Sequence, residues 1–224
     1  MRLVVSILLV FVVASALPIA QTDEARRISE AVTVLREIMD AGDQSVPASI
    51  MQKAQGVAVF PSLLKGGFIV GGQRGRGVLS ARDPKTGEWS SPAFLTITGG
   101  SLGAQIGGQA VDLILVIQNR RGLEQLVNNQ FKIGADASVA AGPVGRDASA
   151  STDIQMRAQI LSYSRTRGLF AGVTLNGTTI RQDRDANDRF YGMGYRTGQV
   201  VFENLAGSPA PVGEWKATLD RYSK

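Results

Sequence analysis

Glycine is concentrated in residues 99–117, GGSLGAQIGGQAVDLILVI, a segment that then becomes almost wholly apolar. Three structures could use such a segment: a phosphate-binding loop that opens a helix, a membrane-inserted segment, or strands of a curved sheet. Its spacing, G-x-x-G-x-x-x-G-G, differs from the G-x-G-x-x-G of dinucleotide-binding loops, and the chain contains no G-x-x-x-x-G-K-[ST]. The apolar run contains Asp112, which would be costly in lipid. The segment therefore favours strands, in which glycine permits bulges, coiling and close backbone approach.

The pattern from residue 56 onward predicts a β-rich body, because short apolar runs alternate with turn signals. Strands are predicted at residues 57–60, 67–72, 75–82, 111–117 and 131–141, with a turn at residues 83–87 (DPKTG) and a type I′ hairpin turn at Asn176-Gly177. A short helix is predicted at residues 120–129. Small residues recur along the strands, so the sheet is expected to be strongly coiled or closed into a small barrel.

Helical patterns flank this body. Residues 22–41 have apolar residues at helical spacing, with Thr22 as N-cap and Gly42 as a stop, and a second helix is predicted at residues 47–54. Further helices are predicted at residues 199–204 and 212–222. The predicted fold is α+β: N-terminal helices packed on a glycine-rich, strongly coiled antiparallel sheet or small barrel, with a C-terminal helix. Its parts are helices in 22–54, a body in 55–192 and a helical tail in 193–224, all within one globular unit of residues 22–224.

The first 16 residues have the pattern of a secretory signal peptide. Arg2 is followed by an apolar stretch over residues 3–13 and an A-x-A site at residues 14–16, with Ala20 as the alternative cleavage point. Eleven apolar residues fall short of the ~20 that span a bilayer. We therefore expect an exported protein, periplasmic or secreted, with peripheral membrane association.

The chain contains neither cysteine nor histidine. This excludes disulfide frameworks, thiolate nucleophiles, Cys/His zinc sites and Ser-His-Asp triads. Residues 62–65 match S-x-x-K and residues 85–87 match K-T-G, two elements of penicillin-binding enzymes, but the S-x-N element is missing from the chain. No pair of acidic residues is distinctive enough to indicate a glycoside hydrolase. We expect no enzymatic activity, no metal and no cofactor.

Charge is unevenly distributed along the chain. Residues 21–55 have a net charge of −2 and residues 56–224 a net charge of +6. A basic body is attracted to lipid head groups, anionic glycans or nucleic acid, and export argues against nucleic acid. The candidate head-group-binding residues are Lys65, Arg74, Arg76, Arg82, Arg120 and Arg121. A strand over residues 75–82 would place Arg74, Arg76 and Arg82 on one face; the alternative is a solvated edge strand that uses charge against aggregation.

Several short motifs occur in a characteristic order. They are W-S-x-P at residues 89–92, an aspartate in an apolar strand at Asp112, G-P-x-G at 142–145, G-L-F-A-G at 168–172 and F-Y-G at 190–192. Together they resemble the SYLF lipid-binding domain family over about residues 54–192. The resemblance implies a fold-defining role for Trp89, Pro92, Asp112, Gly142, Pro143, Gly145, Phe170, Gly172 and Tyr191.

The same resemblance implies a non-enzymatic module that binds acidic lipids. Eukaryotic relatives recognise phosphoinositides and some bind actin, but an exported bacterial member would meet neither, so phosphatidylglycerol, cardiolipin or a host membrane are the accessible anions. The lipid contact of those relatives is associated with a basic N-terminal segment, whereas residues 22–41 here are acidic. This moves the predicted contact to Arg74 and Arg76.

Two alternatives remain open from the sequence. A structural or adhesive envelope protein would use the basic face to bind a protein or an anionic glycan. A small outer-membrane barrel is disfavoured by the N-terminal helices and by an aromatic content of 6%.

Overall fold

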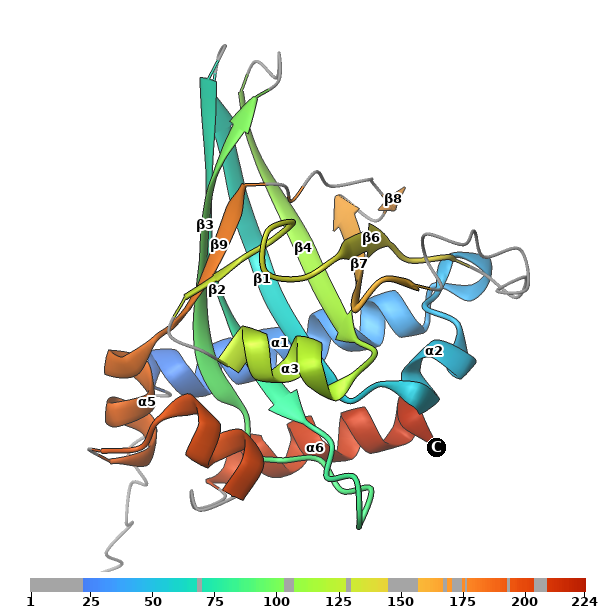
Figure 1. The fold of residues 1–224 in the computed structure, drawn as a ribbon, viewed down its shortest axis with the longest axis vertical. Helices are drawn as coiled ribbons and strands as arrows, with labels where there is room; N and C mark the ends of the chain where they lie inside the picture. Colours follow the sequence, from blue (N-terminus) through green and yellow to red (C-terminus); the bar gives the residue numbers. More distant parts are fainter. Residues whose placement is uncertain are drawn as a thin grey trace, which may run out of the picture.

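A computed structural model describes residues 22–67, 70–102, 107–127, 130–144, 157–166, 169–170, 175, 177–192, 194–203 and 209–224. The predicted signal segment therefore lies outside the described residues, as do Gly145, Gly172 and Asn176. A long, curled sheet dominates the structure, and helices gather around its lower half (Figure 1). This confirms the predicted α+β class.

Three helices pack together on one face of the sheet: α1 (Asp23–Met39), α2 (Ala48–Lys53) and α6 (Ala210–Ser223). The predicted cap of α1 is present, because the Thr22 hydroxyl accepts a hydrogen bond from the amide of Ala25 at 3.1 Å. The chain leaves α1 through Gly42, whose φ of +62° suits glycine, into a short 3-10 turn, η1 (Gly42–Gln44). We call the sheet face under α1, α2 and α6 the helix face.

The described strands form one sheet in the order β5-β9-β3-β2-β1-β4-β7-β6, with β8 paired to β7. Its four long central strands are β1 (Gly56–Gly67), β2 (Val70–Ala81), β3 (Ala93–Leu102) and β4 (Gly107–Ile117). The shorter strands are β5 (Gln130–Lys132), β6 (Val139–Ala141), β7 (Ile160–Thr166), β8 (Leu169–Phe170) and β9 (Thr178–Gln182). All pairings are antiparallel except that of β6 with β7.

The lower half of the sheet is buried on both faces. On the helix face, Val59, Val78 and Phe94 contribute to a core with α1, α2 and α6. On the opposite face, which we call the α3 face, a second core includes residues from α3 (Arg120–Val127) and from the π-helix η3 (Gln199–Glu203). Residues 111–117 of β4 contribute to both cores, which explains their nearly unbroken apolar sequence.

A β-bulge lets β1 continue beyond the proline that was expected to end it. Phe60 pairs with Leu113 and Leu63 pairs with Val111, so two residues of β1 stand opposite Asp112 alone. One of them, Ser62, has a φ of +51°, and its amide donates a hydrogen bond to the Asp112 carboxylate at 2.9 Å. Proline is tolerated at a bulge because it has no N–H for the ladder. The predicted end of the strand at residue 60 was wrong.

Two further expectations need correction. Residues 67–72 were expected to form one strand, but Gly67 ends β1 and residues 70–72 begin β2, which pairs with it. Residues 131–141 do not form one strand, because Gly134 has a φ of +88° and the Asp136 carboxylate accepts a hydrogen bond from the Lys132 amide, which makes a turn between β5 and β6. The predicted turn at Asn176-Gly177 is described only in part, because Asn176 lies outside the described residues. Gly177 has a φ of +77°, and the Thr178 amide donates a hydrogen bond to the Leu175 carbonyl at 3.0 Å. Among the described residues, β8 pairs with β7, and β9 pairs with β3 and β5.

Helix α5 (Arg184–Tyr191) was not predicted, although its sequence carries end signals. The Asp183 carboxylate accepts a hydrogen bond from the Ala186 amide at 3.2 Å, and Gly192 ends the helix with a φ of +92°.

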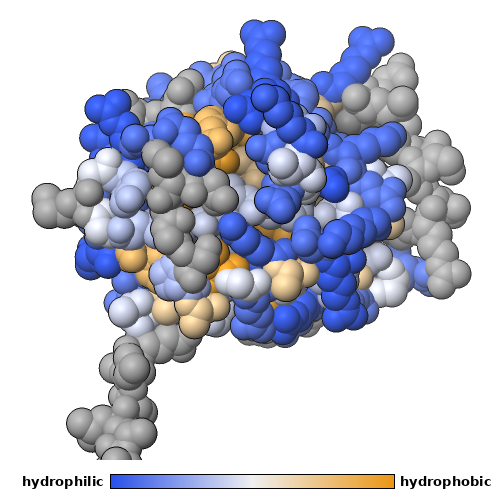
Figure 2. Space-filling model, turned by 90° about the horizontal axis from the view of Figure 1, so that it is seen from below, coloured by the Kyte–Doolittle hydropathy of each residue, from blue (hydrophilic) through white to orange (hydrophobic). Residues whose placement is uncertain are grey.

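The two ends of the sheet are different. The upper ends of β1–β4 rise beyond the helices, whereas α5, α6 and the β2–β3 connection surround the lower end (Figure 1). Seen from below, the lower end is mainly hydrophilic, with hydrophobic residues visible between the hydrophilic ones (Figure 2). The upper end is therefore where sheet residues are left without a covering layer.

Candidate functional site

Four cationic side chains lie on the helix face of the sheet, beyond the part that α1 covers. They are Arg74 and Arg76 of β2, Lys132 of β5 and Arg181 of β9, and all four are exposed. Residues directly opposite each other in paired strands point to the same face, and each strand alternates between faces. We call these four residues the basic band.

The strand register builds the band in two adjacent rows. In the first row Arg76 pairs with Thr96, which pairs with Arg181. In the second row, which lies nearer the upper end, Arg74 pairs with Thr98, Thr98 with Thr179, and Thr179 with Lys132.

Sheet geometry sets the spacing of these cations. Residues two apart along a strand are about 7 Å apart, which sets the distance between the backbones of Arg74 and Arg76. Neighbouring strands are about 4.8 Å apart, so the backbone of Arg181, two strands away, lies roughly 10 Å from that of Arg76. Neither Arg74 nor Arg76 has an ion-pair partner among the described residues, whereas Arg181 donates a hydrogen bond to the Gln130 side chain at 3.4 Å. Guanidiniums left free in this way are suited to phosphate oxygens, to which they can donate two parallel hydrogen bonds.

An exposed leucine adjoins the band. Leu64 of β1 pairs with Arg74 on one side and with Ala110 of β4 on the other. It is 62% exposed, the highest value among the large hydrophobic side chains of the described residues. The upper end of the helix face thus combines free cations with an accessible apolar side chain.

The six sequence-predicted cations do not form one surface. Lys65 pairs with Gln73 and lies on the α3 face, so the sheet separates it from Arg74 and Arg76. Burial lowers the pKa of the Lys65 ammonium from its usual value.

Arg82 and Arg120 lie near the lower end of the sheet. Arg82 follows β2 and donates hydrogen bonds to the carbonyls of Gly87 at 3.0 Å and Gln52 at 2.8 Å, so it holds the β2–β3 connection rather than extending the band. Arg120 pairs with Glu124 at 3.0 Å and lies 4.0 Å from the centre of the Phe202 ring. Arg121 is exposed on α3.

The motif residues near the lower end tie the helices to the sheet. The indole of buried Trp89 donates a hydrogen bond to the Ser223 hydroxyl of α6 at 3.0 Å. The Tyr191 hydroxyl donates to the Pro92 carbonyl at 2.6 Å, and burial raises the pKa of this tyrosine. Asp112, as described above, holds the bulge in β1.

Gly142, the first residue of the G-P-x-G motif, packs against an aromatic ring. A Cβ atom on Gly142 would lie 2.0 Å from Cζ of Tyr163, so only glycine fits there. Burial raises the pKa of Tyr163, whose hydroxyl has no hydrogen-bond partner among the described residues. Pro143 follows and is partly exposed, and Phe170 belongs to β8.

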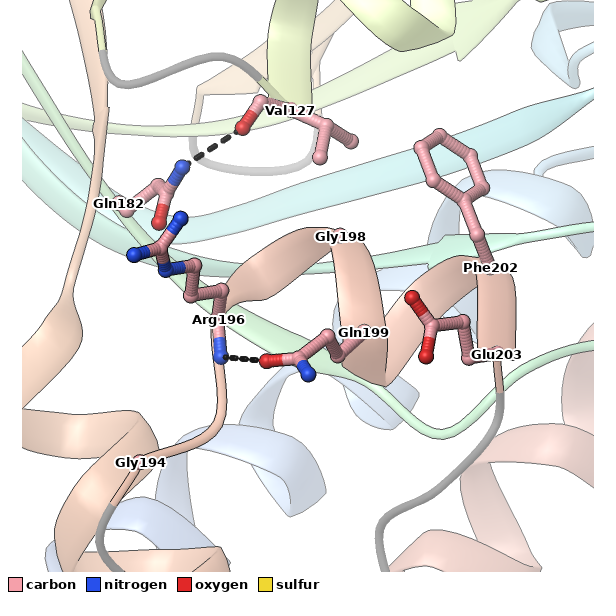
Figure 3. A pocket seen from close by; sticks show the side chains of 8 residues that line it. All are labelled: Val127, Gln182, Gly194, Arg196, Gly198, Gln199, Phe202 and Glu203. Atoms are coloured by element: carbon pink, nitrogen blue, oxygen red, sulfur yellow. Dashed lines mark hydrogen bonds between the residues drawn. The ribbon is translucent and has the colours of Figure 1, made fainter.

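A polar hollow of about 730 Å³ opens between α3, β9 and η3. Figure 3 shows the Arg196 side chain pointing toward Gln182 on one wall, while Glu203 and Phe202 lie on another. The side-chain amide of Gln182 donates a hydrogen bond to the Val127 carbonyl at 2.7 Å. The backbone amide of Arg196 donates one to the side-chain oxygen of Gln199 at 3.0 Å. Among the described residues that line this hollow, none is Ser, Thr, Lys or Tyr.

Two other features bear on function. Within the part of the chain that the structure describes, no cluster of three or more acidic residues is placed to hold a metal ion. The helices described here are all too short or too polar to cross a bilayer.

The fold and the band together define a curled α+β domain that presents exposed cations near the upper ends of its long strands. Comparison with known proteins identifies it further: the chain belongs to the Ysc84 family, described as Las17-binding protein actin regulator, whose model matches residues 98–222. This is the family that the sequence motifs resemble.

Named relatives come from animals and yeast. SH3 domain-containing YSC84-like protein 1 of Rattus norvegicus is 31% identical over 204 residues, which cover 90% of this chain and 59% of the relative. Protein YSC84 of Saccharomyces cerevisiae is 31% identical over 194 residues, which cover 85% of this chain and 41% of the relative. LAS seventeen-binding protein 3 from the same yeast is 30% identical over 194 residues, with 85% and 42% covered. The chain thus spans about half the length of these relatives.

Proposed function

We propose that this protein is a non-enzymatic module that binds membranes rich in anionic phospholipid, with the basic band as the head-group contact. The observation that carries the proposal is the pairing of Arg74, Arg76, Lys132 and Arg181 in two adjacent rows on an uncovered part of the sheet. No acidic residue stands between these cations in the two rows, because the residues between them are the threonines Thr96, Thr98 and Thr179.

The charge of the band sets the affinity that it can provide. Each Lys or Arg close to an anionic bilayer contributes about 1 kcal/mol. Four such residues therefore give about 4 kcal/mol, which corresponds to a millimolar dissociation constant. Reversible, salt-sensitive binding is expected, and Leu64 is positioned to add an apolar contribution.

The proposed location is outside the cytoplasm, at the periplasmic or outer surface of a membrane, on the strength of the N-terminal sequence pattern. Phosphatidylglycerol and cardiolipin are the anionic lipids proposed for that location.

A protein partner is the second candidate. It is favoured by the names of the relatives, one of which is a LAS seventeen-binding protein. The same band could meet an acidic protein surface, and an inert response to vesicles would favour this alternative.

The test is co-sedimentation of residues 17–224, the predicted mature chain, with vesicles. Vesicles of neutral phosphatidylcholine are compared with vesicles containing phosphatidylglycerol or cardiolipin. The Arg74→Gln/Arg76→Gln variant removes two band charges, and Lys53→Gln/Lys85→Gln removes two exposed charges elsewhere. We expect the band variant to bind about 30-fold more weakly and the control to change less than threefold. Equal binding by the band variant and the wild type would overturn the proposal.

A further inference from the structure

We propose that the protein docks end-on: the upper ends of β1–β4 enter the head-group layer, so that lipid contacts both faces of the sheet there. This inference rests on the proposed function and adds an orientation to it. The alternative is face-on docking, in which only the helix face meets the membrane. The two orientations differ in whether adjacent residues of one strand, whose side chains lie on opposite faces, both contact lipid.

Cations lie on both faces at the same level of the sheet. Lys65 pairs with Gln73 on the α3 face, and the adjacent pair, Leu64 with Arg74, lies on the helix face. Face-on docking would leave Lys65 on the far side of the sheet, away from lipid phosphates. End-on docking brings Lys65 and Arg74 to the phosphates together.

One polar atom beside Lys65 is buried without a partner in the described part of the chain. The Gln73 side chain is 3% exposed, and its Nε2 donates a hydrogen bond to the Thr178 hydroxyl. Its Oε1 is buried and accepts no hydrogen bond within the described part of the chain. A lipid head group could satisfy both groups: its anionic oxygen would accept a hydrogen bond from the Lys65 ammonium, and its hydroxyl would donate one to Gln73 Oε1.

The sequence beyond this level is free of charge. From residue 66 to residue 72, and from residue 100 to residue 108, no Asp, Glu, Lys or Arg occurs. The opposite end of the sheet differs, since the β2–β3 connection there carries Asp83, Lys85 and Glu88. Turns at the exposed ends of strands are usually polar, so the absence of charge at one end only indicates that this end meets an apolar or interfacial partner.

A hollow at the same level offers space for lipid. It measures about 660 Å³ and is lined by Leu64, Lys65, Gly72, Gln73, Arg74, Gln109 and Ala110. These residues come from both faces of β1, β2 and β4, with the cations Lys65 and Arg74 among them. An anionic bilayer complements this arrangement, because its phosphates match the cations and its acyl region matches Leu64 and the uncharged ends.

Two adjacent residues of β4 separate the orientations. Gln109 pairs with Lys65 and lies on the α3 face, whereas Ala110 pairs with Leu64 and lies on the helix face; both are exposed. The chain has no cysteine, so Gln109→Cys and Ala110→Cys each give a single labelling site. Thr33→Cys on α1 and Lys85→Cys at the lower end serve as controls, since both residues are exposed.

Each variant carries an environment-sensitive fluorophore, and its emission is recorded with phosphatidylglycerol vesicles and with nitroxide-bearing lipid as a quencher. We expect blue shifts and quenching at positions 109 and 110 and none at 33 and 85. A response at 110 without one at 109 would show face-on docking and overturn this inference while leaving the proposed function intact. If the unlabelled wild type does not bind the vesicles at all, both the proposed function and end-on docking are overturned.

Charge removal gives an independent readout. We expect Lys65→Gln to weaken vesicle binding about fivefold, the effect of one cation close to an anionic surface. Arg181→Gln removes the same charge from the row farther from the strand ends and should have a smaller effect. A weaker effect of Lys65→Gln than of Arg181→Gln would contradict end-on docking.

Discussion

The bulge in β1 provides the sharpest prediction about stability, because one side chain holds it. Asp112→Ala removes the carboxylate that accepts a hydrogen bond from the Ser62 amide at 2.9 Å. Ser62 has a φ of +51°, so this hydrogen bond holds a residue in an unfavourable conformation. A hydrogen bond to a charged group contributes about 1.5–3 kcal/mol, and exposure of Ser62 lets water replace part of it. We therefore expect a loss of about 1.5 kcal/mol in the free energy of unfolding. Asp112→Asn keeps an acceptor oxygen and should lose less than half as much.

Urea unfolding followed by tryptophan fluorescence measures this loss. Trp89 and Trp215 are both buried in the helix-face core and report its opening. With a slope of about 2 kcal/mol per molar urea, the midpoint should fall by about 0.7 M for Asp112→Ala. Adding Ser62→Gly to that variant should recover part of the loss, because glycine adopts a positive φ without strain. A midpoint within about 0.2 M of the wild type, or equal losses for alanine and asparagine, would refute this account of the bulge.

Other variants test the packing and the titration of buried groups. Gly142→Ala should destabilise the protein by about 1–3 kcal/mol, because the added methyl group would overlap the Tyr163 ring. Gly213→Ala in α6 should stabilise it by about 0.5–1 kcal/mol, because the space around this glycine is open. Urea midpoints that do not differ in this order would contradict the packing. Tyr163→Phe should be neutral or stabilising because the buried hydroxyl has no partner, while Tyr191→Phe should cost about 1 kcal/mol because its hydroxyl donates to Pro92. Burial raises the pKa of both tyrosines, so above pH ~10 the unfolded chain loses protons that the folded chain keeps, and stability should fall as the pH rises. The double Phe variant should show a shallower decline between pH 10 and pH 11, and an unchanged slope would count against this assignment.

The general architecture was predictable because its signals are local. Thr22 and Gly42 mark the ends of α1, and the unbroken apolar run at the end of β4 indicates a strand covered on both faces. The failures have physical causes as well. Side-chain alternation counted across Pro61 would place Leu64 on the same face as Phe60, but the extra residue of the bulge moves it to the other face.

The candidate site was predictable only in part. Arg74 and Arg76 are close in sequence, so alternation along one strand identifies them. Lys132 and Arg181 join them only through the pairing of β3 with β9 and of β9 with β5, and no local pattern specifies that register. The same dependence on register explains why Lys65, nine residues from Arg74 in sequence, lies on the opposite face of the sheet.

The salt dependence of vesicle binding tests the central claim most directly. Binding of residues 17–224 to phosphatidylglycerol vesicles would be measured for the wild type and for Arg74→Gln/Arg76→Gln at about 0.1 M and 1 M salt, where the screening length falls from about 10 Å to 3 Å. If the basic band holds the membrane, the wild type binds at the lower salt, loses most of its affinity at the higher salt, and loses more than the variant does. Binding that is absent at both salt concentrations, or that responds to salt equally in the two proteins, would contradict the account.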